Sequence, residues 1–135
     1  MKYIVQVLAI LLIILSCSTT KSVTHTEINT DDSLNGRKFK LISIYPEMNI
    51  TIEFTPDTIL GFSAVNNYSS SYMLDGDIFN VLSISMTKKT GSREKIAAEI
   101  EYLNMLKNAT SYEIKGKKLT IYTLLSNNNL VFEEI

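Results

Sequence analysis

The chain has 135 residues, a formal net charge of −1 and 45% hydrophobic residues. This balance argues against a nucleic-acid-binding protein, because the basic residues are dispersed and form no basic stripe. One cysteine and one histidine leave no side chains for an internal disulfide, a Cys–His pair or most transition-metal sites. We therefore predict no catalytic residues, no metal site and no cofactor in a single domain with one hydrophobic core.

A short apolar segment opens the sequence and ends at the only cysteine. Residues 4–15 are aliphatic except for Gln6 and are fewer than the ~20 that a spanning helix needs. The string Ile14-Leu15-Ser16-Cys17 has the pattern of a bacterial lipobox, in which the thiol is alkylated with diacylglycerol and the chain is cut before it. We predict a signal peptide over 1–16 and lipidation at Cys17. An uncleaved anchor helix and an ordinary secretory signal are the alternatives.

Residues 17–33 are rich in Ser, Thr, Asn and Asp, and this composition predicts a flexible tether before a folded domain over 34–135. The lone His25 falls in the tether, where it has no fixed catalytic partner. Ser18 follows the modified cysteine at the position where an aspartate would retain a lipoprotein in the inner membrane of enteric bacteria. We therefore predict a protein held in the cell envelope by its acyl chains, on the outer membrane and facing the periplasm.

The folded part is predicted to consist mainly of β-strands. Alternating or apolar runs predict, in chain order, strands over Phe39–Tyr45, Ile50–Phe54 and Thr58–Val65, hairpins over Ser71–Phe79 and Ser111–Leu119, and a closing strand over Leu130–Glu133. Gly61 inside the third strand suggests a bulge or a close approach of two backbones. Asp75-Gly76-Asp77 is interpreted as a tight turn, because a calcium loop needs more oxygen ligands over a longer spacing.

One segment has helical spacing. Over Arg93–Asn108 the apolar residues that recur on one face are Ile96, Ala97, Ile100, Leu103 and Leu106. Ser92 is the predicted N-cap. We expect this stripe to pack on the sheet. A membrane-surface or partner-docking helix is the alternative, and it is disfavoured because the polar face mixes Glu94, Glu99 and Glu101 with Lys95.

Asn66, Asn67 and Tyr68 are the best candidates for a specific role outside the N-terminus. They are predicted to form a polar loop after the third strand. The interpretation that we favour is structural, with an asparagine side chain bonding to backbone groups and Tyr68 packed beneath. The alternative is the polar rim of a ligand groove.

The order of these elements resembles the META domain, also called HslJ-like (DUF306). Four strings carry the resemblance: Leu34–Leu41, Gly61–Tyr68, Glu99–Leu106 and Ser111–Ile114. The resemblance implies an α+β fold, with a mostly antiparallel curved sheet or partly open barrel and a single amphipathic helix inserted before the last strands. It also marks Gly61, Asn66 and Tyr68 as motif residues, to which we assign structural roles.

The same resemblance guides the functional prediction. Family members are small envelope or secreted proteins, linked to stress tolerance, antibiotic resistance or virulence, with no established enzymatic activity. Two cysteines common in the family are missing from Ala64-Val65 and from 86–91, so no redox role transfers. We predict a non-catalytic envelope lipoprotein that acts as an interaction, envelope-maintenance or stress-tolerance module with an envelope protein partner. The alternative is a binder of a lipid or another small apolar ligand between sheet and helix.

Overall fold

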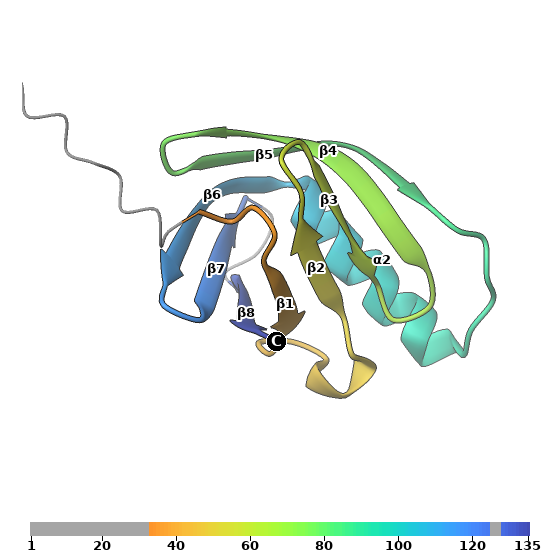
Figure 1. Cartoon of the computed structure of the whole chain (residues 1–135). Helices are drawn as coiled ribbons and strands as arrows, with labels where there is room; N and C mark the ends of the chain where they lie inside the picture. The colour runs from red at the N-terminus through yellow and green to blue at the C-terminus, as the bar shows by residue number, and fades with distance from the viewer. Residues whose placement is uncertain (1–32, 125–127) are drawn as a thin grey trace, which may run out of the picture.

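The computed structural model describes residues 33–124 and 128–135 (Figure 1). The elements are, in order, β1 (Lys38–Leu41), the 3-10 helix η2 (Pro46–Met48), β2 (Thr51–Phe54), β3 (Thr58–Phe62), β4 (Asn67–Asp75), β5 (Ile78–Met86), α2 (Arg93–Lys107), β6 (Ala109–Lys115), β7 (Lys118–Thr123) and β8 (Leu130–Glu134). The predicted signal peptide, Cys17, His25 and all of the predicted tether except Ser33 lie outside the described residues.

The eight strands form a closed antiparallel barrel, in which each strand pairs with the next and β8 pairs back onto β1. The join between β5 and β6 is the shortest, with the single ladder pair Ile78–Ser111 and a bond of 2.9 Å from the Tyr112 amide to the Asp77 carbonyl. The chain inserts α2 between these two strands. The predicted α+β class, with an antiparallel barrel and one helix before the last strands, is confirmed.

Two strands end earlier than predicted, and a residue with left-handed backbone lies in the segment that follows each of them. β1 ends at Leu41, and Tyr45 with φ 47° precedes η2. β3 ends at Phe62, and Ala64 has φ 87°. Conversely, β4 begins at Asn67, so Asn67 and Tyr68 belong to a strand instead of the predicted loop. The turn between β3 and β4 is therefore confined to residues 63–66.

The core lies inside the barrel and is rich in aromatic rings. Phe54 makes edge contacts with Phe39 and Tyr72 at centroid distances of 6.1 and 5.6 Å. Burial of each ring contributes about 2–3 kcal/mol to the free energy of unfolding, and the edge-to-face geometry stabilises the core further. The buried apolar residues of the described chain fall between Leu34 and Phe132.

Helix α2 packs on the barrel through a different face from the predicted one. Ser92 caps it as predicted, accepting a bond of 3.3 Å from the Lys95 amide. The residues that α2 buries are Ala98, Glu99, Tyr102, Met105 and Leu106. Of the predicted stripe only Leu106 is buried, while Leu103 is half-buried and Ala97, Ile96 and Ile100 are exposed.

The prediction of the packed face was wrong because isoleucines give a strong hydrophobic signal, whereas Glu99 is expected at the surface. Glu99 is nevertheless 4% exposed, and its burial depends on partners outside α2. Within the described residues, no helix has both the length and the apolar character needed to span a bilayer.

Candidate functional site

Gly61 lies where the backbones of β2 and β3 and the ring of Tyr68 converge. A Cβ atom at this position would lie 2.0 Å from the Thr51 carbonyl oxygen and 2.9 Å from a ring carbon of Tyr68. The predicted close backbone approach is therefore confirmed. Because Gly61 has no side chain, the Tyr68 hydroxyl reaches the Thr51 carbonyl and donates a hydrogen bond of 2.9 Å.

Tyr68 also meets Tyr102, which α2 inserts into the barrel. Their hydroxyl oxygens lie 2.6 Å apart, and their ring centroids are 5.8 Å apart. Tyr102 continues the contact to Phe132 of β8 at 6.4 Å. Burial raises the pKa of both Tyr68 and Tyr102. Both phenols are therefore neutral at physiological pH and serve as hydrogen-bonding groups in the core.

Glu99 brings a buried carboxylate to the turn between β3 and β4. Its Oε2 accepts hydrogen bonds from the Ser63 hydroxyl at 2.5 Å and from the Asn66 amide at 2.8 Å. Its Oε1 accepts from the Asn66 side-chain Nδ2 at 2.8 Å. Burial alone would raise the pKa of Glu99, but the bonds from Ser63 and Asn66 outweigh it and hold that pKa below its usual value.

Asn66 extends the same network to the segment before α2. Its Oδ1 accepts from the Thr87 hydroxyl at 2.8 Å and from the Lys89 amide at 2.7 Å. Its backbone carbonyl accepts from both the amide and the hydroxyl of Ser63, at 2.8 and 2.9 Å. We call residues 63–66 and 87–92 the rim loops. Asn66 joins the two loops, and Glu99 ties them to α2.

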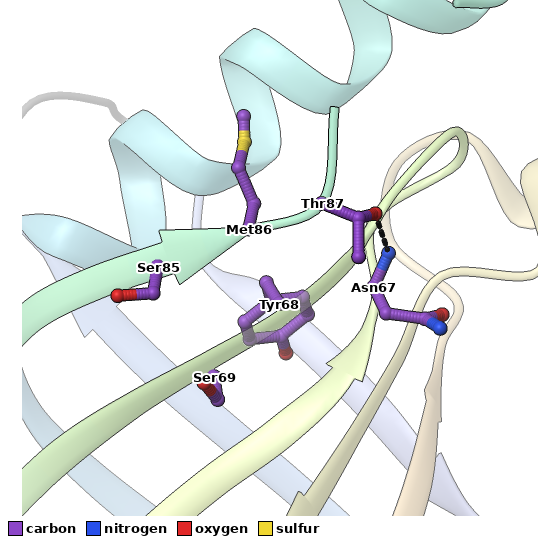
Figure 2. A pocket seen from close by; sticks show the side chains of 6 residues that line it. All are labelled: Asn67, Tyr68, Ser69, Ser85, Met86 and Thr87. Atoms are coloured by element: carbon purple, nitrogen blue, oxygen red, sulfur yellow. Dashed lines mark hydrogen bonds between the residues drawn. The ribbon is translucent and has the colours of Figure 1, made fainter. Parts of the chain in front are cut away.

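Three open hollows lie on the surface around this network. One, of about 320 Å³, lies where β4 begins and β5 ends. Figure 2 shows the other residues that line it around Tyr68: Asn67, Ser69, Ser85, Met86 and Thr87. The Asn67 amide donates to the Thr87 hydroxyl at 3.2 Å across it (Figure 2). A second, of about 330 Å³, adjoins Gly61 and Phe62. A third, of about 300 Å³, lies between the rim loops, beside Lys89 and Lys95.

The structure places Gly61 and Tyr68 in one cluster with Thr51 and Tyr102. Asn66 lies in a second cluster with Glu99, and α2 contributes a side chain to each cluster. Sequence reasoning missed Glu99 and Tyr102, although both fall within the string Glu99–Leu106 that supports the family resemblance. Asp75 and Asp77 lie at the exposed turn of the β4–β5 hairpin, with Gly76 at φ 60°. The described part of the chain contains no cluster of acidic, His or Cys side chains that could hold a metal ion.

The comparisons with known proteins agree with this architecture. Residues 22–134 match the META domain family. The fold is similar to an NMR structure of a protein from Burkholderia xenovorans, with a TM-score of 0.61 and 18% identity over 76% of this chain and 83% of that one. It is also similar to a crystal structure of a DUF4847 family protein from Bacteroides vulgatus, with a TM-score of 0.58 and 12% identity over 76% and 95%. No curated protein sequence matches the chain.

Proposed function

Because the chain belongs to the META domain family, we propose that it is a non-catalytic, lipid-anchored module of the bacterial envelope that binds a protein partner. The observation that carries this proposal is the use of the buried polar groups. Both polar atoms of the Asn66 side-chain amide are hydrogen-bonded: Oδ1 accepts from Thr87 and Lys89, and Nδ2 donates to Glu99. Glu99 is in turn bonded to Ser63 and Asn66. The network thus uses these buried polar groups to fix the rim loops.

A rigid rim favours binding. Loops that are already ordered lose little conformational entropy on association, so a partner meets a preorganised surface. The hollow of Figure 2 lies beside these loops and is lined by exposed Asn67, Ser69 and Ser85. We propose that this hollow and the rim loops form the partner-binding surface.

The carrier alternative has less support. The space between α2 and the barrel is occupied by side chains of the core, since Tyr102 packs edge-on against both Tyr68 and Phe132. All three rings are at most 3% exposed. An acyl chain would have to displace these rings, whereas the three hollows around the network are open to solvent.

Site-specific photo-crosslinking in the producing cells tests the partner-binding surface. A crosslinker at Asn67 or Ser85 is expected to give one defined protein adduct. The matched control positions are Asn80 and Ser83, which are exposed on β5 outside the hollow, and these are expected to give none. Equal labelling at all four positions, or no adduct at any, would contradict the proposal.

The lipid anchor has a separate test. Cys17→Ala removes the thiol that the lipobox pattern predicts to be acylated, while Ser18→Ala leaves it in place. We expect Cys17→Ala to block processing and to move the protein out of the outer-membrane fraction, with Ser18→Ala unchanged in processing. Unaltered migration and membrane association of Cys17→Ala would refute lipidation.

A further inference from the structure

The outward face of α2 carries an apolar stripe with a cation at each end. Its members follow one another at intervals of three and four residues, which aligns them along one side of a helix; they are Arg93, Ile96, Ile100, Leu103 and Lys107. We call this set the outer stripe. Ile96 is 38% exposed and Ile100 is 65% exposed, while Leu103 packs partly against the core.

The acidic residues of α2 lie off the outer stripe. Glu99 is buried in the network, and Glu101 accepts a hydrogen bond of 2.5 Å from the Tyr45 hydroxyl. Glu94 lies in the first turn, on the same flank as Glu101 by helical spacing. The sequence suggested a polar face of mixed charge on α2, but the fold separates these carboxylates from the exposed isoleucines.

Both charges within the outer stripe are positive, and neither has an ion pair among the described residues. Arg93 and Lys107 take part in none of the salt bridges of the described chain. Residues 86–95 contain four basic side chains and one acidic one, although the whole chain has a net charge of −1. Lys88, Lys89 and Lys95 also have no ion pair among the described residues, but they lie in the rim loops and on another flank of α2, off the outer stripe.

From this arrangement we propose that the outer stripe is a membrane-contact surface, on which α2 lies flat against an anionic bilayer. Isoleucines in the acyl boundary and lysine or arginine at the headgroup level are the arrangement of interfacial helices. Anionic lipid is complementary to the cations Arg93 and Lys107, whereas packing of the outer stripe against the same stripe of a second copy would bring like charges together. The contact does not require acylation of Cys17.

A single tryptophan can report on the contact, because the chain contains none. The full chain would be reconstituted into vesicles of phosphatidylcholine and phosphatidylglycerol in which the phosphatidylcholine acyl chains are brominated. We expect the emission of Ile100→Trp to be blue-shifted and quenched at least about twofold more than that of Leu82→Trp. Leu82 is a matched control, because it is 48% exposed on β5. Equal emission and quenching at the two positions would overturn the proposal.

The charge requirement has its own control. Adding Arg93→Gln and Lys107→Gln to Ile100→Trp is expected to reverse most of the quenching, as is replacement of phosphatidylglycerol by phosphatidylcholine. Lys115→Gln with Lys117→Gln removes the same charge elsewhere and is expected to have no effect. Raised salt should weaken the contact. A blue shift that disappears when the protein is diluted to one chain per vesicle would instead indicate self-association and would overturn the proposal.

Discussion

A carboxylate links separate segments of the chain at two places in this barrel, the rim loops and the join of β1 with β8, and the partners of the two carboxylates differ. At the rim loops, Glu99 is buried and accepts hydrogen bonds from uncharged groups, those of Ser63 and Asn66 among them. At the join of the first and last strands, Glu134 faces the guanidinium of Arg37, with bonds of 2.8 and 2.7 Å. Arg37 also donates to the Gly116 carbonyl at 2.6 Å.

From this difference we expect burial, more than formal charge pairing, to determine how much each carboxylate contributes to the stability of the fold. The pKa of each is held below its usual value, that of Glu99 by hydrogen bonds that outweigh burial and that of Glu134 chiefly by the bond from Arg37. The partners of Glu99 cannot be replaced by water without opening the rim, whereas those of Glu134 remain accessible to solvent and salt.

The largest expected effect comes from adding one methyl group beneath the rim. Gly61→Ala would place a Cβ atom 2.0 Å from the Thr51 carbonyl oxygen, so β2 and β3 must separate and Tyr68 must shift. We expect the free energy of unfolding to fall by about 3 kcal/mol or more. Urea denaturation measures it, with Ser69→Ala on the exposed side of β4 as a control that should change little. Wild-type stability of Gly61→Ala would contradict the close packing described for this site.

The next effect concerns the buried carboxylate itself. Glu99→Gln removes the charged acceptor that Ser63 and Asn66 share, and we expect a loss of about 2–3 kcal/mol at neutral pH. The pKa of Glu99 is lower in the folded protein than its usual value of 4.5. The ionised carboxylate therefore contributes fully to the free energy of unfolding above pH 4.5, and this contribution is lost as the pH falls through the lower pKa of the folded state.

The pH dependence distinguishes this variant from a general destabilisation. Denaturation series between pH 7 and pH 3 should show the gap between wild type and Glu99→Gln closing at the acid end. Glu101→Gln, an exposed neighbour on α2, should keep the wild-type profile. A gap of constant size at every pH would show that the ionised form of Glu99 is not what stabilises the rim.

The smallest effect is expected at the strand join. Glu134→Gln weakens the pair with Arg37 but leaves the partners in contact with water, so its destabilisation should be smaller than that of Glu99→Gln. High salt should reduce the difference between Glu134→Gln and wild type, because it screens exposed pairs more than buried ones. Thermal denaturation at low and high salt measures this, with Glu133→Gln as the matched control. A larger loss than for Glu99→Gln would reverse the comparison.

Local chemistry was sufficient to predict much of the fold. The alternation in Ile50–Phe54, the Asp-Gly turn between β4 and β5 and the cap at Ser92 each depend on neighbours in the sequence. These features predicted strands, hairpins and one helix. The resemblance to the META domain implied the antiparallel curved sheet or partly open barrel and the residues of its motif. The closeness of Gly61 to another backbone was also predictable, because a glycine inside a strand is costly unless the space is needed.

Patterns along the chain were enough to predict the presence of the strands, the helix and the motif residues, whereas the buried face of α2 depends on the assembled barrel. Glu99 has the polarity of a surface residue, and Ile96 and Ile100 have that of core residues. Glu99 is nevertheless buried and the two isoleucines are exposed. The reason is that Ser63 and Asn66, more than thirty residues away in the sequence, supply the hydrogen-bond donors that make a buried carboxylate stable. A buried charge is acceptable only where its partners are already in place, and that condition belongs to the assembled barrel.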